Sequence, residues 1–270
     1  MGRPISLPTR FGVPLWTLIL TLFSFQPAAH SELKGIGFED KQAAYETYYT
    51  KSFAVCIGIN DYESWPDLSY AEEDATAIAE VFRMQGFDVN VLLGQAATRK
   101  AILRALGEDL AKKAGPNDRV VIYFSGHGQT ESLASGRQVG YIIPVDCPQS
   151  DYLTSAISMT QLREIHDRLR AKHILYLMDS CYSGQGFLKS GGIDPNTADY
   201  VNVVTGRRAV QMITAGDAGQ QAQESDGHGL FTEYVLRGLK GEADIQPVDG
   251  VVTVGELGLF VERPVFERSN

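Results

Sequence analysis

Two stretches of the chain share one unusual pattern: VVIYFSGHGQT (Val120–Thr130) and HILYLMDSCYSG (His173–Gly184). In each, a run of apolar residues ends abruptly, the first in a histidine between two glycines and the second in Asp-Ser-Cys. A continuous apolar run of this length predicts a strand buried on both faces, as in a parallel sheet. Open α/β sheets bind ligands at the carboxyl ends of their strands, so His127 and Cys181 are expected at that edge.

Strands and helices alternate along the rest of the chain after residue 52. Short apolar runs predict the strands, and apolar residues at helical spacing predict the helices between them. The predicted strands are 53–60, 87–93, 119–124, 141–146, 173–179 and 209–216, and the predicted helices are 74–86, 98–114, 160–170 and 229–239. This alternation indicates an α/β fold, an α/β/α sandwich with a mostly parallel central sheet.

Composition and charge narrow the range of partners. The chain has 270 residues, 44% of them hydrophobic and 21% charged, which is ordinary for a globular protein of one large or two small domains. The net charge is −9 and the basic residues form no long run, which argues against nucleic acid and against an anionic membrane surface as partners. An acidic balance suits a cationic substrate.

The N-terminus has the order of a signal peptide. Arg3 and Arg10 precede the apolar stretch 11–25, and the small residues of QPAAHS (26–31) follow it. We expect cleavage after Ser31 and export, to a periplasmic or extracellular location. An uncleaved N-terminal anchor is the alternative, and contact with a membrane is expected only through that segment.

The three cysteines predict a free thiol. Cys56, Cys147 and Cys181 cannot form a disulfide framework, and the chain has neither a CxxC nor a Cys/His cluster at zinc spacing. Cys56 is expected inside a buried strand and Cys147 is expected to be partly exposed. Cys181 is the candidate nucleophile, since a nearby imidazole can take the thiol proton and return one to a leaving amine. The glycines beside His127 would let a peptide backbone approach, and the amides of Gly128 and Cys181 could line an oxyanion hole.

YFSGHGQT and LMDSCYSG resemble the histidine and cysteine blocks of the caspase-like cysteine peptidases, in the form of the metacaspases and their bacterial relatives, the orthocaspases. Residues 54–75 resemble the family's first strand and following loop, and residues 207–216 and 227–239 resemble its small-subunit region. The resemblance covers roughly residues 53–260. It implies a caspase-like sandwich, a cysteine endopeptidase activity, His127 as the general base and Cys181 as the nucleophile.

An acidic pocket is expected beside this dyad. Residues i and i+2 of an extended strand point the same way, so Asp179 is expected on the same side as Cys181. The resemblance adds Asp74 and Ser125 to this pocket, which would bind the side chain that precedes the cleaved bond. Two carboxylates would hold a guanidinium well, so the pocket is expected to accept arginine, with lysine second. The alternatives are structural: Asp74 as an acid in the first turn of a helix, and Asp179 as the cap of a turn.

Calcium is a further question that the resemblance raises, because many metacaspases need it. Calcium requires six to eight oxygen ligands. Asp146 is present, but no acid follows in SAISMTQL (155–162), and in IQPVDGVVTVGE (245–256) only Asp249 and Glu256 fall on ligand positions. The chain is therefore expected to use no cofactor and to hold no metal.

The expected organisation is a signal peptide (1–31), a lead-in (32–52), a peptidase domain (53–262) with a long loop at about 184–206, and a C-terminal tail (263–270). The expected substrates are proteins or peptides with arginine or lysine at the cleaved position. Self-cleavage is expected after one of three basic residues near the loop, namely Lys189, Arg207 and Arg208. Two other functions stay open: a non-peptidase binding or scaffold module with the same fold, and a gingipain-like or clostripain-like cysteine peptidase.

Overall fold

The computed structural model describes residues 48–180, 206–215, 224–225, 227–245, 248 and 250–269. The expected signal peptide, most of the lead-in, Cys181 and Lys189 therefore lie outside the described residues.

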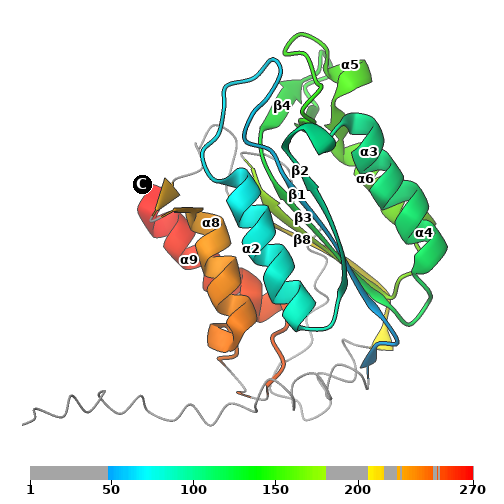
Figure 1. Cartoon of the computed structure of the whole chain (residues 1–270), viewed down its shortest axis with the longest axis vertical. Helices are drawn as coiled ribbons and strands as arrows, with labels where there is room; N and C mark the ends of the chain where they lie inside the picture. The colour runs from blue at the N-terminus through cyan, green and yellow to red at the C-terminus, as the bar shows by residue number, and fades with distance from the viewer. Residues whose placement is uncertain are drawn as a thin grey trace, which may run out of the picture. The chain divides into compact units, whose positions relative to one another are not determined.

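A five-stranded sheet with the order β2-β1-β3-β7-β8 forms the centre of the described part (Figure 1). All four strand pairings in this sheet are parallel, and consecutive strands are joined by helical crossovers where the connection is described. Its strands, in chain order, are β1 (Ser52–Gly58), β2 (Asp88–Leu93), β3 (Arg119–Ser125), β7 (His173–Asp179) and β8 (Ala209–Thr214). The predicted α/β class with a mostly parallel central sheet is confirmed.

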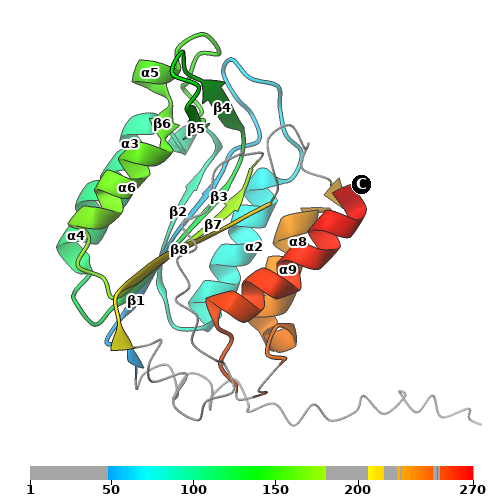
Figure 2. The ribbon, with the colours of Figure 1, turned by 180° about the vertical axis from the view of Figure 1, so that it is seen from behind.

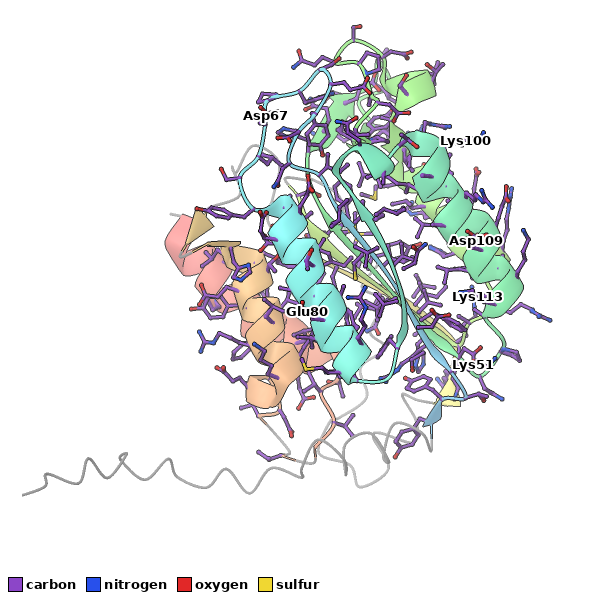
Figure 3. The ribbon with its side chains drawn as sticks, viewed as in Figure 1. Lys51, Asp67, Glu80, Lys100, Asp109 and Lys113 are labelled. Atoms are coloured by element: carbon purple, nitrogen blue, oxygen red, sulfur yellow. The ribbon has the colours of Figure 1, made fainter. Side chains whose placement is uncertain are left out.

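Helices cover both faces of this sheet, as Figures 1 and 2 show from opposite sides. One face carries α2 (Ala71–Met84), α8 (Leu230–Arg237) and α9 (Val254–Ser269). The other carries α6 (Met159–Arg168) and a continuous helical run made of α3 (Arg99–Arg104), the π-helical turn η2 (Ala105–Asp109) and α4 (Leu110–Lys113). In Figure 3, Lys100, Asp109 and Lys113 lie along the outer face of that run, away from the sheet.

The alternation of side chains along the strands divides the core into two layers. On β1, Phe53, Val55 and Ile57 pack into the layer beneath α3, α4 and α6. Ala54 and Cys56 point the other way, into the layer beneath α2, α8 and α9. A strand that is buried on both faces has no polar alternation, and for that reason its sequence is a continuous apolar run.

A small antiparallel sheet that the sequence did not predict follows β3. It consists of β4 (Gly128–Ser132), β5 (Gln138–Ile142) and β6 (Ile157–Ser158). The strand expected at 141–146 contributes only its first two residues to β5, because the chain leaves the sheet at Ile143-Pro144. The polar sequence of β4 gives no apolar run, so its pairing depends on β5 rather than on its own propensity.

The other short elements are the 3₁₀ turn η1 (Gly94–Ala96), α5 (Tyr152–Ser155), the antiparallel pair β9 (Glu224–Ser225) and β10 (His228–Gly229), and the π-helical turn η3 (Gly238–Glu242). Helix α9 runs across residue 262, where the peptidase domain was expected to end. No helix within the described ranges is both long and apolar enough to cross a membrane.

Candidate active site

The carboxyl ends of three neighbouring strands lie level with one another and carry the candidate site. Ser125, the last residue of β3, pairs with Gly58 at the end of β1 and with Asp179 at the end of β7. His127 follows β3 by two residues, and β7 ends two residues before Cys181. The structure therefore places the strand before the histidine and the strand that leads into the cysteine block side by side, with their carboxyl ends at one edge of the sheet.

The loop between β1 and α2 holds the ring of His127. Its Nε2 lies 2.7 Å from the backbone oxygen of Pro66. A carbonyl oxygen only accepts hydrogen bonds, so Nε2 carries the hydrogen of the neutral imidazole and Nδ1 keeps the free electron pair. The rings of Tyr62 and Trp65 lie against the imidazole, with centroids 4.8 and 5.5 Å away. The loop thus fixes both the tautomer and the orientation of the expected base.

The backbone beside His127 is held by a buried hydroxyl. The amide of His127 donates to Oη of Tyr62 at 2.9 Å, and that hydroxyl donates to the oxygen of Ile143 at 3.2 Å. Gly126 fits here because a Cβ at this position would lie 2.5 Å from the Tyr62 hydroxyl and 2.9 Å from the ring of Phe124. The glycine is therefore required by the close approach of the loop that positions the histidine.

Burial lowers the pKa of His127, and the hydrogen bond to Pro66 opposes this shift. At neutral pH the ring is therefore uncharged and able to accept a proton. Cys181 lies outside the described residues, so its separation from the imidazole stays a prediction. Gly128, an expected oxyanion donor, is the first residue of β4 and directly follows His127. The amide of Gly126 instead donates to the backbone oxygen of Asp179, at 3.3 Å.

Two buried carboxylates meet next to this edge. Asp74, in the first turn of α2, is 2% exposed, and Asp179 is 5% exposed. A Cβ on Gly229 would lie 2.7 Å from an oxygen of Asp179 and 3.1 Å from an oxygen of Asp74, so both acids approach the same point. Ser125, itself buried, ends the strand next to Asp179. The structure thus brings together the three residues expected to form the acidic pocket.

Each carboxylate has partners from the segment that leads into α8. Asp74 Oδ1 lies 2.5 Å from Nδ1 of His228, and its Oδ2 accepts from the amide of Gly229 at 3.0 Å. Asp179 Oδ2 accepts from the hydroxyl of Thr232 at 2.5 Å. Gly229 is the N-cap of α8 and has no side chain of its own to cap the helix. The two acids therefore supply acceptors at a helix N-terminus, where free amides and the helix dipole favour negative charge.

Burial nevertheless makes both acids hard to ionise. It raises the pKa of Asp179 to about 7, the Thr232 hydroxyl opposes this shift, and the charge of Asp74 adds to it. Burial also raises the pKa of Asp74, opposed by the hydrogen bonds from His228 and Gly229. Without a bound cation the pair holds less than its full charge at neutral pH, and a cation beside it would favour ionisation of both.

Sequence reasoning missed the residues that support the site. His228 was not expected at the site, and the structure places its imidazole on Asp74. Thr232 gave no signal, since a threonine in the first turn of a helix is common. The motif GHG at 227–229 repeats the glycine-flanked histidine of residues 126–128, and this repetition was the one available sign.

The structure places Arg207 and Arg208 far from His127. They precede β8, which begins beside His173 at the amino end of β7, the edge opposite His127. The oxygen of Arg207 lies 2.7 Å from Nε2 of His173, and the guanidinium of Arg208 donates to the backbone oxygen of His166 at 2.8 Å. Of the three expected self-cleavage positions, these two are anchored in the fold and Lys189 lies outside the described residues.

Asp249 lies outside the described residues, and the other acids considered for calcium, Asp146 and Glu256, have partners within the fold. Cys56 and Cys147 are both buried and free, so the expectation that Cys147 is partly exposed was wrong; burial raises its pKa to about 11. Asp146 accepts from the amide of Arg99, and Glu256 accepts from the amide and hydroxyl of Thr253 at the start of α9. Among the described side chains no group of three or more His, Cys, Asp or Glu is placed to hold a metal ion.

Known proteins similar to this chain identify its family. The family model of the caspase domain matches residues 51–257. Metacaspase-1B of Neurospora crassa is 30% identical over 171 residues, which cover 54% of this chain and 38% of that protein. Metacaspase-1 of Pyricularia oryzae is 30% identical over 194 residues (63% and 47%), and metacaspase-1 of Saccharomyces cerevisiae (strain YJM789) is 26% identical over 243 residues (78% and 55%). The chain thus spans about half or less of the length of these relatives.

A solved structure supports the fold alone. The crystal structure of protein GSU0716 from Geobacter sulfurreducens superimposes with a TM-score of 0.57 at 20% identity, covering 79% of this chain and 88% of that one. The family model covers well over half of the chain, and its match includes both strand ends described above. With the metacaspases among its relatives, the chain belongs to the caspase-domain family of cysteine peptidases, in its metacaspase-like form.

Proposed function

We propose that this protein is a cysteine endopeptidase that cleaves peptide bonds after arginine or lysine. The observation that carries the proposal is the pair of buried carboxylates, Asp74 and Asp179, at the strand edge that also carries His127. A guanidinium or ammonium beside them would supply a positive charge to both carboxylates. Arginine is expected to be favoured, because its planar fork can bind carboxylate oxygens in pairs.

The reaction follows from the tautomer of His127. Nδ1 takes the proton of the Cys181 thiol, and the thiolate attacks the carbonyl carbon that follows the basic residue. The oxyanion that forms would be held by the amides of Gly128 and Cys181. The intermediate collapses, the C–N bond breaks, and the amine leaves with the proton from the imidazolium. Water, deprotonated by His127, then hydrolyses the thioester and restores the thiol.

The two alternatives predict different behaviour. A binding or scaffold module needs no charged pocket beside a neutral imidazole with a fixed tautomer, and it would cleave nothing. A gingipain-like or clostripain-like enzyme would share the basic specificity, so it is distinguished by fold rather than by activity. The match of the caspase-domain model across residues 51–257 favours the caspase-like reading.

The test uses fluorogenic peptides that differ only at the cleaved position, with arginine, lysine, leucine or aspartate. We expect turnover of the arginyl and lysyl peptides, loss of turnover after alkylation with iodoacetamide, and none in Cys181→Ala. Cleavage of the leucyl or aspartyl peptide at rates equal to the arginyl one would contradict the specificity. A wild-type protein that cleaves none of the four would support the binding module.

We also propose that residues 1–31 direct export and that activity needs no calcium. Arg3, Arg10 and the apolar stretch 11–25 support the first proposal, and the scarcity of acids at calcium-ligand positions supports the second. N-terminal sequencing of the exported protein, and peptide turnover with a calcium chelator, test them. An N-terminus at Met1 in the membrane fraction would show an uncleaved anchor, and loss of activity that calcium restores would show a calcium site.

A further inference from the structure

A chain of buried hydroxyl groups ends at the carboxylate of Asp179. Oη of Tyr123, on β3, lies 2.5 Å from Oγ1 of Thr232, on α8, and this oxygen lies 2.5 Å from Oδ2 of Asp179. Tyr123 and Thr232 are both 0% exposed. The chain therefore joins three different elements beneath the acidic pocket, out of contact with solvent.

The direction of the hydrogen bonds is fixed by the acid. An ionised carboxylate only accepts, so the Thr232 hydroxyl donates its one hydrogen to Asp179, and Tyr123 must donate to Thr232. Hydrogen bonds in such a chain polarise one another, and a hydroxyl that donates to a charged oxygen is among the stronger ones. The backbone amide of Thr232, in the first turn of α8, also stabilises the charge of Asp179.

The groups around Asp179 oppose its ionisation. Burial raises the pKa of Asp179, the charge of Asp74 on α2 raises it further, and the imidazole of His228 on β10 lies against Asp74. Tyr123 on β3 keeps its proton, since burial raises its pKa well above the usual value. The donors that favour the charged form of Asp179 among the described residues are therefore those of Thr232.

We propose that Thr232, oriented by Tyr123, is a positioning residue for the selection of basic substrates: its hydroxyl favours the ionised form of Asp179 and fixes the rotamer of this carboxylate for the substrate's cation. The inference rests on the proposed function, in which Asp179 is a specificity carboxylate. The hydroxyl of Thr232 bonds to Tyr123 and Asp179, so its effect on substrate selection is expected to appear through Asp179.

The decisive variant is Thr232→Val, which keeps the shape of the side chain and removes the donor. Without the donor, the acid side of the profile of kcat/KM against pH should move up by about one pH unit or more, because Asp179 ionises less readily. We therefore expect kcat/KM for an arginyl peptide to fall about ten- to a hundred-fold at about pH 6, and this deficit should shrink above about pH 8. Inhibition by benzamidine, a small amidinium probe, should weaken in the same pH-dependent way. Thr232→Ser keeps the donor and should restore the wild-type acid limb. Tyr123→Phe should shift the limb in the same direction, but less.

Controls separate this role from a loosened fold. Thr76→Val removes a hydroxyl that donates to the backbone of α2 at Glu72, and it should leave the pH profile of peptide turnover unchanged. The urea midpoint of each variant checks folding. A deficit in Thr232→Val that is equal at every pH, or no deficit at all, would overturn the positioning role even if arginine remains preferred.

The proposed function fails in a different way. If wild type does not prefer arginyl peptides, or if Asp179→Asn keeps that preference, the pocket assignment is wrong, and the role of Thr232 is overturned with it. If Asp179→Asn loses the preference while Thr232→Val behaves as wild type, only the role of Thr232 is overturned.

Discussion

Nε2 of His127 lies 2.7 Å from the backbone oxygen of Pro66, in the loop between β1 and α2. The acceptor is a main-chain atom, so no substitution at residue 66 removes it. The imidazole is thereby oriented by the shape of the loop between β1 and α2 rather than by a third catalytic side chain. In Figure 3 the labelled Asp67 marks this loop, above the end of the sheet.

Removing either member of the dyad should abolish catalysis without unfolding the protein. Cys181→Ala is expected to show no peptide turnover, and His127→Ala should lose about a thousand-fold or more, because the thiol loses its base. Steady-state kinetics with an arginyl peptide, together with the urea midpoint of each variant, provide the measurement. Turnover by purified Cys181→Ala above the level of a mock preparation would refute the assignment of the nucleophile.

Asp179→Asn should alter selectivity more than catalysis in general. The change removes one charge with almost no change in shape, and we expect kcat/KM for arginyl and lysyl peptides to fall about a hundred-fold or more. The measurement is the ratio of arginyl to leucyl turnover. Asp118→Asn is a matched control, because Asp118 is a buried acid that accepts backbone amides of Lys51 and Gly115, at the amino end of β3. An unchanged ratio in Asp179→Asn would remove this residue from the pocket.

The pH dependence of turnover should report Asp179 rather than His127. In the free enzyme the pKa of Asp179 is raised to about 7, whereas that of His127 is lowered, so His127 is already neutral where Asp179 still carries a proton. Since kcat/KM reports the free enzyme, its value for an arginyl peptide should fall as the pH drops through about 7. Asp179→Asn should move the remaining acid limb to lower pH. An identical limb in both proteins would assign it to another group.

The same pKa implies that the site destabilises the unoccupied fold at neutral pH. Asp179 binds its proton more tightly when folded, with a pKa of about 7 against 3.8, so the free energy of unfolding loses this contribution as the pH rises from about 4 to 7. Asp179→Asn should therefore raise the free energy of unfolding at about pH 8, by roughly 1–3 kcal/mol, and raise it less at about pH 5. Urea denaturation at the two pH values measures this difference. A larger gain at the lower pH would contradict the assigned sign.

Gly126→Ala should damage both stability and activity. The new Cβ would lie 2.5 Å from the Tyr62 hydroxyl, which must move and release the amide of His127. We expect a loss of about 1–3 kcal/mol in the free energy of unfolding, with reduced kcat. Gly107→Ala is the control, because its nearest neighbour would be a side-chain carbon of Ile165 at 3.8 Å. It sits in a helical run and should be neutral or stabilising. Equal behaviour of the two variants would argue against the steric requirement.

Self-cleavage, if it occurs, should fall after Lys189 and not after Arg207 or Arg208 in the same molecule. The two arginines are held at the edge of the sheet opposite His127, so their peptide bonds cannot enter their own site while β8 stays paired. Fragment masses after incubation of wild type and Cys181→Ala measure the outcome. A cut after Arg208 at a rate that does not depend on protein concentration would overturn this expectation, and equal nicking of the inactive variant would show a contaminating protease.

The strand ends were predictable from the sequence because two simple rules act on them. A buried parallel strand must be apolar on both faces, so β3 and β7 are conspicuous, and parallel strands end at one common edge. The register that sets Ser125 beside Asp179 follows from this, and the structure shows it. The resemblance to metacaspases then supplied Asp74.

Contacts that join distant segments were beyond the reach of sequence patterns. The pairing of Asp74 with His228 and of Asp179 with Thr232 depends on how α8 approaches α2 and β7, which is a matter of tertiary packing. Likewise the polar strand β4 forms because β5 pairs with it, and its own residues have little intrinsic preference for a strand. Buried polar groups find partners wherever the fold brings them together, and their spacing along the chain carries little information.

The two acids that are expected to bind the basic side chain of the substrate also accept hydrogen bonds from the N-terminus of α8. A change of the proposed specificity toward acidic substrates would require replacement of Asp74 and Asp179, and the amide of Gly229 and the hydroxyl of Thr232 would then lose their acceptors. An incoming aspartate side chain could take up those same donors. Residues 229–232 would therefore have to be varied together with the two carboxylates in any laboratory evolution of the proposed specificity.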